Sequence, residues 1–164
     1  MEPLIKRQKD KNTLREFFLS EEFPPENLVC VTIWIVQYKD NFIFTENHRG
    51  IEMPGWHIEP WESIQEGLKR EIAEETWAII KEKYKLIWHT KVHNKTKKKR
   101  KDWKWYYPSP HAYVAYFLTK AETLREPHGE ETIARHIIHK DEIHTVQLHD
   151  TAQKILKAVI EKYT

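Results

Sequence analysis

Three glutamates stand close together in the run Arg70-Glu71-Ile72-Ala73-Glu74-Glu75. On a helix, Glu71 lies about one turn from both Glu74 and Glu75, so the three carboxylates project toward one region. Like charges in one place repel unless a positive charge neutralises them. Oxygen ligands favour Mg²⁺ or Mn²⁺ over zinc. The run therefore predicts a helical site for a hard divalent cation.

The acids lie at the edge of the apolar stripe of this helix, which consists of Ile64, Leu68 and Ile72. An ordinary surface helix carries its charges on the opposite face. Gly67 falls between Glu74 and Glu71, where a missing side chain predicts close approach of a cation or phosphate. Carboxylates beside a core should have raised pKa values unless a divalent cation keeps them ionised. A solvated acidic helix with salt bridges is the alternative, and the spacing of Glu66 and Arg70 fits it.

The surrounding segment, residues 53–78, resembles the signature box of the Nudix hydrolases. That box has a fixed order of positions: Gly, five residues, Glu, seven residues, Arg-Glu, an apolar residue, any residue, Glu-Glu, any residue, Gly and an apolar residue. The charged positions are all filled here, by Glu62, Arg70, Glu71, Glu74 and Glu75. The resemblance implies an α/β fold, the Nudix-type α/β/α sandwich with a mixed β-sheet, as one domain over residues 1–164.

The resemblance also implies an activity: hydrolysis, dependent on Mg²⁺ or Mn²⁺, of a pyrophosphate bond in a nucleoside diphosphate linked to another moiety, X. Carried over by position, the metal-binding and catalytic acids are Glu71, Glu74 and Glu75. Glu71 is also the candidate base or base-orienting group. The backbone carbonyl of Gly55 is a further expected metal ligand. Arg70 is expected to anchor the loop by pairing with an acid such as Glu62, rather than to contact substrate.

Other candidate site residues lie in loops. Family members often recruit an acid from outside the box, and Glu130 and Glu131 are the candidates, with Glu131 assigned to the metal; both also fit turn residues. The substrate-binding candidates are His57, Glu59, Tyr107 and Ser109, and Glu59 is also placed to support the metal site. Residues 106–111 fit either a pocket wall that stacks rings or a proline-stiffened loop packed on its own aromatics.

Tryptophan stands at three positions that are usually glycine in the box: Trp56, Trp61 and Trp77. The chain has 4 Gly and 7 Trp in 164 residues, whereas average usage of about 7% predicts roughly eleven glycines, which indicates a Gly-to-Trp bias, natural or engineered. Trp77 is expected at the helix C-cap, where glycine commonly takes the left-handed conformation. Strain of about 1 to 3 kcal/mol per site follows if that backbone is kept. Trp34 and Trp88 fit ordinary core packing.

These tryptophans leave two hypotheses open. The first is an active pyrophosphohydrolase, which the complete set of acids favours. The second is a catalytically impaired Nudix-like domain that binds a nucleotide or has a regulatory role, which Trp56, Trp61 and Trp77 favour. A third hypothesis is an RNA-associating protein that uses the basic run Lys95 to Lys101, KTKKKRK, with the aromatic residues 103–107 beside it. The alternative for that run is a solvated hairpin tip.

Composition limits the remaining classes. A chain of 164 residues with 40% hydrophobic content is long enough for one core, and its net charge of +2 does not define a nucleic-acid binder. The single cysteine, Cys30, lies in an apolar run and is expected to be buried, which excludes an intrachain disulfide. No stretch approaches the roughly 20 apolar residues of a membrane span, so we expect a cytoplasmic protein. The family resemblance implies a small-molecule substrate of the nucleoside diphosphate type. A homodimer is a further expectation from the family.

The hydrophobic pattern predicts mixed secondary structure. Residues 1–27 are expected to form an N-terminal extension with a short helix at 13–19. Strands are expected at 29–38, 41–45, 84–92, 112–119 and 132–138. The sequence from Ser63 to Glu66 fits a capping box, so the acidic helix should begin after Ser63 and end near Thr76. A C-terminal helix is expected within 148–164.

Overall fold

The computed structural model describes residues 3, 5–10, 13–58, 62–94, 110–126 and 132–163. The α-helices are α1 (Ile64–Thr76) and α2 (Asp150–Tyr163), and short 3-10 helices span Glu26–Leu28 and Lys140–Thr145. The strands are β1 (Ile5–Asp10), β2 (Thr13–Phe18), β3 (Val29–Tyr38), β4 (Asn41–Asn47), β5 (Gly50–Glu52), β6 (Gly55–His57), β7 (Ala78–Asn94), β8 (His111–Leu124) and β9 (Ala134–His139).

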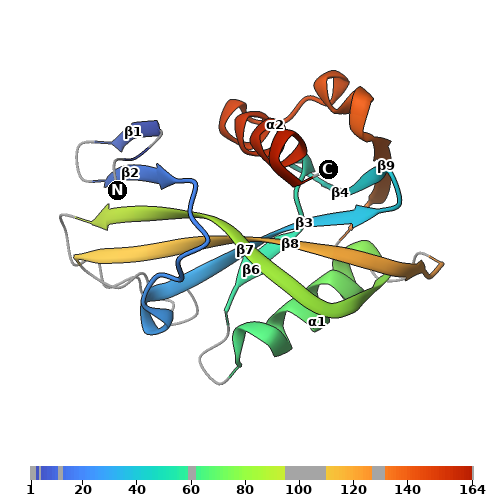
Figure 1. The fold of residues 1–164 in the computed structure, drawn as a ribbon, viewed down its shortest axis with the longest axis horizontal. Coiled ribbons are helices and arrows are strands. Elements are labelled where there is room, and N and C mark those ends of the chain that lie inside the picture. The colour runs from blue at the N-terminus through green and yellow to red at the C-terminus, as the bar shows by residue number, and fades with distance from the viewer. Residues whose placement is uncertain are drawn as a thin grey trace.

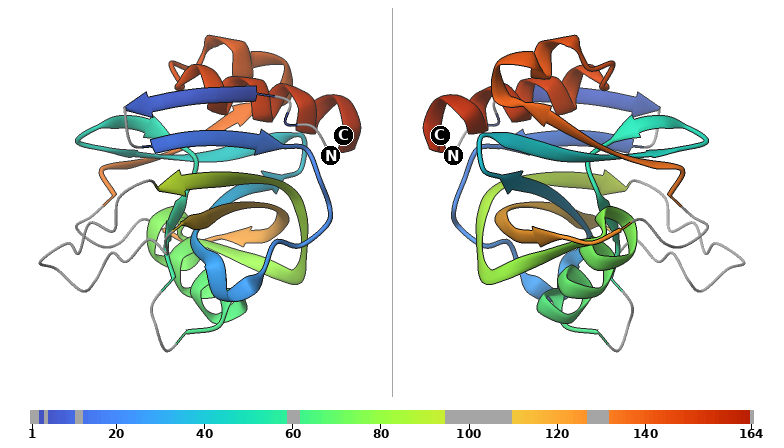
Figure 2. Two further views of the ribbon diagram at one scale, coloured as in Figure 1. Left: turned by 90° about the vertical axis from the view of Figure 1, so that its left-hand side faces the viewer. Right: turned by 90° about the vertical axis from the view of Figure 1, so that its right-hand side faces the viewer.

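The described strands form one mixed sheet with α1 and α2 on opposite faces (Figures 1 and 2). The strand order is β1-β2-β7-β8-β3-β4-β5, while β6 also pairs with β3 and β9 with β4. Strands β3 and β8 run parallel, and the other described pairs are antiparallel. This arrangement is the predicted α/β/α sandwich.

The alternation of side chains along β3 builds one core on each face of the sheet. Ile35 belongs to the core beneath α2, which also contains Ile155. Trp34 belongs to the core beneath α1, together with Leu68. Trp34 and Trp88 are both fully buried, which confirms that these two tryptophans are core residues. Cys30 is buried as expected, and burial raises the pKa of its thiol to about 12.

The predicted helix at residues 13–19 is wrong, because this segment is the strand β2. It pairs with β1 on one side and with β7 on the other, from Thr13 opposite Asn94 to Phe18 opposite His89. The apolar residues of the segment fit a helical period as well as a strand. Hydrogen bonding to two neighbouring strands and the burial of Phe17 favour a strand over a helix for this segment.

The other predicted elements are present: β3 has its predicted bounds, β4, β7 and β8 are longer than predicted, and β9 begins two residues later than predicted. The turn at Lys39-Asp40 joins β3 to β4, with Lys39 at a φ of 56°. The expected strand at 84–92 lies inside β7, whose bulges let it follow β8 over most of its length. The C-terminal helix is confirmed as α2. In the described ranges, no helix has the length and apolarity that crossing a bilayer requires.

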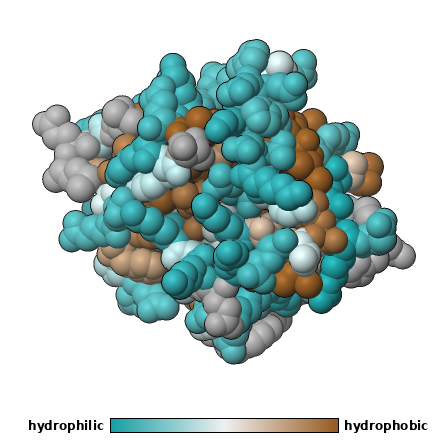
Figure 3. Space-filling view, turned by 45° about the vertical axis from the view of Figure 1, so that its right-hand side comes forward, coloured by the Kyte–Doolittle hydropathy of each residue, from teal (hydrophilic) through white to brown (hydrophobic). Residues whose placement is uncertain are grey.

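The surface in Figure 3 is mostly hydrophilic, with hydrophobic residues exposed in separate patches. The large apolar side chains that are most exposed in the described ranges are Phe23, Ile79, Ile133 and Ile137. Scattered exposed apolar residues are normal in folded proteins. The expected homodimer therefore stays a prediction.

Candidate active site

The start of α1 is fixed by the predicted capping box. Ser63 Oγ accepts a hydrogen bond from the backbone N–H of Glu66 at 3.2 Å, and the Glu66 carboxylate accepts one from the backbone N–H of Ser63 at 2.9 Å. These bonds satisfy two of the free donors at the helix N-terminus. Helix α1 then ends at Thr76, as expected, so the order of the acids along it follows the predicted register.

Arg70 connects the loop before α1 to the acids on the helix. Its Nε donates to Glu62 Oε1 at 2.9 Å and its Nη2 donates to Glu62 Oε2 at 3.0 Å, which is a bidentate pair. Its Nη1 donates to Glu71 and, at 3.2 Å, to Glu74 Oε2. The hydrogen bonds to Glu62 and Glu71 raise the pKa of the guanidinium. One arginine therefore contacts three carboxylates, and its single positive charge offsets only part of their negative charge.

Glu71 is the buried acid of the cluster, whereas Glu74 is exposed. The Glu71 side chain is 9% exposed and the Glu74 side chain 63%. Burial raises the pKa of Glu71 from 4.5 to about 6, although the hydrogen bond from Arg70 acts in the opposite direction. The raised proton affinity that crowding beside a core predicts is therefore present at Glu71. A carboxyl that titrates near 6 is suited to proton transfer close to neutral pH.

Glu75 contacts the strand β6 instead of Arg70. Its Oε2 accepts a hydrogen bond from the backbone N–H of Gly55 at 3.0 Å. Gly55 packs against β3 so closely that a Cβ would lie 2.5 Å from the carbonyl oxygen of Thr32 and 2.8 Å from the Cα of Ile33. Position 55 therefore requires glycine, and its backbone lies directly beside an acid of α1.

Gly67 has a different role from the one predicted. A Cβ at this position would lie 2.9 Å from Oε2 of Glu62. The space beside Gly67 is therefore filled by the loop carboxylate that pairs with Arg70, and the prediction that a cation or phosphate approaches there is wrong. The missing side chain lets Glu62 approach the helix.

The donor types of this cluster suit a hard divalent cation, because they are carboxylate oxygens. In the described part of the chain, however, no group of three or more His, Cys, Asp and Glu side chains is arranged to hold a metal ion. Nη1 of Arg70 stands as the positive charge between Glu71 and Glu74. Binding a cation with these two acids therefore requires them to exchange contacts with Arg70.

Comparison with protein families identifies the fold around this cluster. Residues 27–162 match the model of the NUDIX domain. The chain belongs to the Nudix family. No curated protein matches the sequence significantly.

Solved Nudix structures share the fold at low identity. A mutant of the Bacillus subtilis pyrophosphohydrolase BsRppH is similar with a TM-score of 0.70 and 18% identity, over 98% of this chain and 98% of that one. A MutT structure from work on Aliivibrio salmonicida and Vibrio cholerae is similar with a TM-score of 0.57 and 16% identity, over 82% of this chain and 98% of that one. An ADP-ribose pyrophosphatase from Streptococcus suis is similar with a TM-score of 0.52 and 11% identity, over 83% of this chain and 93% of that one. These likenesses confirm the predicted fold class.

The closing tryptophan of the Nudix box, Trp77, keeps the conformation that glycine favours. It is the C-cap of α1 with φ 51° and ψ 32°, in the left-handed region, as expected. Its side chain is nevertheless buried, at 3% exposure, and Arg135 lies over the ring at 5.8 Å from the centroid. Nη1 of Arg135 also donates to the carbonyl of Thr76 at 3.0 Å, which caps the helix end. Packing and capping therefore offset backbone strain at this position.

Trp56 occupies the opening glycine position of the Nudix box without left-handed strain. It lies in β6 opposite Thr32 of β3, half-buried, with its ring edge-on to His57. Lys39 and Trp77 are the non-glycine residues with positive φ in the described ranges, so Trp56 is not among them. The candidate His57 ends the same strand.

Several predicted site residues lie outside the described residues: Glu59, Trp61, Tyr107, Ser109, Glu130, Glu131 and the basic run 95–101. Their roles stay predictions.

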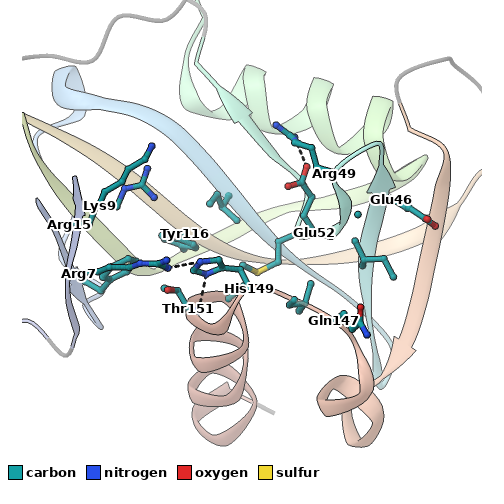
Figure 4. A pocket seen from close by; sticks show the side chains of 17 residues that line it. Arg7, Lys9, Arg15, Glu46, Arg49, Glu52, Tyr116, Gln147, His149 and Thr151 are labelled. Carbon is teal, nitrogen blue, oxygen red and sulfur yellow. Dashed lines mark hydrogen bonds and ion pairs between the residues drawn. The ribbon is translucent and has the colours of Figure 1, made fainter. Parts of the chain in front are cut away.

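A cavity of about 880 Å³ lies beside the Nudix box, on the α2 side of the sheet (Figure 4). Met53, two residues before Gly55, lines it. Three cations of the N-terminal hairpin also line it, Arg7, Lys9 and Arg15. The sequence did not indicate these cations as a group, because the pattern at 13–19 predicts a helix, and only the pairing of β1 with β2 places Arg15 opposite Arg7.

Proposed function

We propose that this Nudix protein hydrolyses a pyrophosphate bond in a nucleoside diphosphate linked to a moiety X, with Mg²⁺ or Mn²⁺ as cofactor. The observation that supports this most is the placement of Glu71 and Glu75 on one helix, with Glu71 buried beside Arg70 and Glu75 bonded to the backbone of Gly55. Acids in such a position suit the binding of a cation next to a diphosphate.

Each residue of the cluster has a proposed role. Glu75, Glu74 and the carbonyl of Gly55 would hold the cation, with Glu131 as a further ligand. When bound, a divalent cation screens the polyphosphate, lowers the pKa of the attacking water and stabilises the leaving oxygen. Glu71, with a pKa of about 6, accepts or orients the proton of that water.

The loop that leads into α1 has a positioning role in this proposal. Arg70 holds Glu62 by two hydrogen bonds and Glu71 by one. Fixing the loop relative to the acids keeps the substrate and the reacting water in register, because small displacements of catalytic groups are costly. His57 and Glu59, with Tyr107 and Ser109, are the proposed substrate contacts.

The second candidate function is a nucleotide-binding or regulatory Nudix domain without turnover. The specific observation in its favour is that Arg70 occupies the place between Glu71 and Glu74, while the described residues contain no three-residue metal cluster. In this case the chain would still bind a nucleoside diphosphate but release it unchanged.

One experiment separates the two functions. Purified protein is incubated with ADP-ribose, a dinucleoside polyphosphate, a nucleotide sugar and nucleoside triphosphates, each with Mg²⁺ or Mn²⁺, and the products are separated by chromatography. The enzyme proposal predicts metal-dependent cleavage of at least one compound, which Glu75→Gln abolishes. The control is Glu161→Gln, a change to a side chain on α2 that is 66% exposed.

A further variant tests impairment by the loop tryptophans. Trp56→Gly with Trp61→Gly restores two glycines of the box and leaves the packed Trp77 in place. If only this variant cleaves a substrate, the chain is an impaired enzyme. If no variant cleaves any compound, the catalytic proposal fails.

A further inference from the structure

The cavity beside the Nudix box has a basic wall that comes from the N-terminal hairpin (Figure 4). Strands β1 and β2 form this hairpin and end at Phe18. The match to the NUDIX domain begins at residue 27. The matched range therefore does not include this hairpin.

Two arginines of the hairpin face each other directly. Arg7 of β1 is the cross-strand partner of Arg15 of β2. Like charges opposite each other on paired strands are destabilising. Both side chains line the cavity, and Lys9 adds a third positive charge at a register shift of the same hairpin. Such an arrangement is stabilised when an anion lies between the charges.

These cations are not neutralised by acids in the part of the chain that is described. Nη1 of Arg7 lies 2.5 Å from Nε2 of His149, and since a guanidinium only donates, the ring nitrogen accepts and the charge of Arg7 remains. Arg15 forms no ion pair with a described residue, and its buried Nε has no hydrogen-bond partner there. A buried donor without a partner costs about 1 to 3 kcal/mol, and no contact with a described residue compensates the charge of Arg15 beside the cavity.

The acids of the cavity are already engaged on its other side. Glu52 pairs with Arg49 at 2.5 Å, and Glu46 contacts His136 at 2.7 Å. They therefore do not compensate the hairpin. The cavity thus has a surplus of positive charge at the hairpin, and the acids Glu46 and Glu52 line its other side (Figure 4).

The size and floor of the cavity fit part of a nucleotide. Its volume of about 880 Å³ lies in the range of small-molecule sites. Its lining includes the apolar or aromatic side chains Phe17, Ile33, Met53 and Tyr116. Met53 is separated from Gly55 by a single residue, and an extended chain advances about 3.3 to 3.6 Å per residue. Met53 therefore lies within about 7 Å of Gly55, whose backbone N–H bonds to Glu75 of α1.

We propose that Arg7, Lys9 and Arg15 bind a phosphate group of the substrate other than those of the diphosphate that is hydrolysed. This inference rests on the proposed function for the position of the diphosphate, and it narrows the substrate class. The preferred substrates carry an additional phosphate on a ribose, or the phosphate that joins a second nucleotide.

Matched pairs of compounds test the proposal directly. NADP⁺ and NAD⁺, like coenzyme A and dephospho-coenzyme A, differ by one phosphate outside the diphosphate. Their dissociation constants are measured by isothermal titration calorimetry with EDTA present, so that cleavage does not interfere. At least one phosphorylated member is expected to bind about tenfold more tightly than its partner, as for a charge-assisted hydrogen bond. An adenosine 5′-triphosphate compared with a 5′-triphosphorylated dinucleotide tests the phosphate that joins two nucleotides.

Variants assign the preference to the hairpin. The double variant Arg7→Gln with Arg15→Gln should reduce the preference for the phosphorylated compound to about twofold or less. The control Arg125→Gln changes an exposed arginine outside the cavity and should retain that preference. If the double variant does not fold, Lys9→Gln, a change to an exposed residue, replaces it in the test. This variant should bind the phosphorylated compound about threefold more weakly than the wild type does. The preference should also decline with added salt.

The outcomes are distinct from those for catalysis. A preference for NADP⁺ over NAD⁺, or for coenzyme A over dephospho-coenzyme A, indicates a small-molecule substrate with a ribose phosphate. A preference found only for the dinucleotide indicates that the substrate is the 5′ end of a nucleic acid. Either result supports the proposal. Equal affinities within every pair, or a preference that all the hairpin variants retain, overturn it. If the preference exists but no compound is cleaved with Mg²⁺ or Mn²⁺, the anion site stands and the proposed function fails.

Discussion

The carboxylate of Glu75 accepts a hydrogen bond of 3.0 Å from the backbone N–H of Gly55. This contact joins the last turn of α1 to the strand β6, and β6 in turn pairs with β3 in the centre of the sheet. The position of an acid that we assign to the cation therefore depends on the close packing of one glycine.

Gly55→Ala is expected to disturb this contact. The added Cβ would lie 2.5 Å from the carbonyl oxygen of Thr32, so β6 must move away from β3. Overpacking of this kind costs about 1 to 3 kcal/mol. Urea denaturation should show that loss of unfolding free energy, together with reduced cleavage. A variant with unchanged stability would contradict the close packing at this position.

Gly67→Ala should affect activity more than stability. Alanine raises helix propensity by about 1 kcal/mol, while its Cβ would lie 2.9 Å from Glu62 Oε2 and displace that carboxylate from Arg70. We expect a change in unfolding free energy below about 1 kcal/mol and a fall in kcat/KM of about tenfold. Gln65→Ala, at an exposed position of the same helix, is the control. Equal kinetics for the two variants would show that Glu62 does not position the site.

The buried Glu71 should make stability depend on pH. Its pKa in the folded protein is about 6, above the ordinary value of 4.5. Between these values the folded state binds more protons than the unfolded state, so the unfolding free energy falls as the pH rises, by about 2 kcal/mol in total. The unfolding free energies of the wild type and of Glu71→Gln are measured from pH 4 to pH 8 in steps of about one unit. The difference between the two proteins should change across the pH range between the unfolded and folded pKa values of Glu71. A constant difference would mean that Glu71 titrates normally.

Trp77→Gly should destabilise the protein although it restores the glycine of the Nudix box. Removing a left-handed non-glycine residue recovers about 1 to 2 kcal/mol, but loss of a buried tryptophan side chain costs about 3 to 5 kcal/mol. A net loss of about 1 to 4 kcal/mol in unfolding free energy is expected from these values, measured by thermal or urea unfolding. Trp56→Gly, at a half-buried position without positive φ, should lose less. A more stable Trp77→Gly protein would mean that strain dominates there.

Local signals predicted the parts of this structure that local interactions decide. The capping box from Ser63 to Glu66 set the start of α1, and the turn at Lys39-Asp40 set the β3–β4 hairpin. The spacing of the acids then followed from the helix. The pair of Arg70 with Glu62 was expected from the family pattern and is present.

Long-range pairing decided what the sequence did not reveal. Residues 13–18 have an apolar pattern that fits a helix, but β1 and β7 pair with them as a strand. The same pairing places Arg15 opposite Arg7, which no local pattern indicates. The contact between Gly67 and Glu62 likewise depends on the path of the loop before the helix. These features are tertiary, so propensity and spacing alone do not contain them.

The binding of Mn²⁺ tests the central claim most directly, because the account requires the acids of α1 to hold a divalent cation beside the substrate. Calorimetric titration of Mn²⁺ would be performed on the wild type, Glu75→Gln and the exposed control Glu161→Gln, each with a slowly cleaved nucleoside diphosphate compound. We predict that Glu75→Gln binds Mn²⁺ at least about tenfold more weakly than the other two proteins. Equal affinities in all three, or no binding by the wild type, would contradict the account.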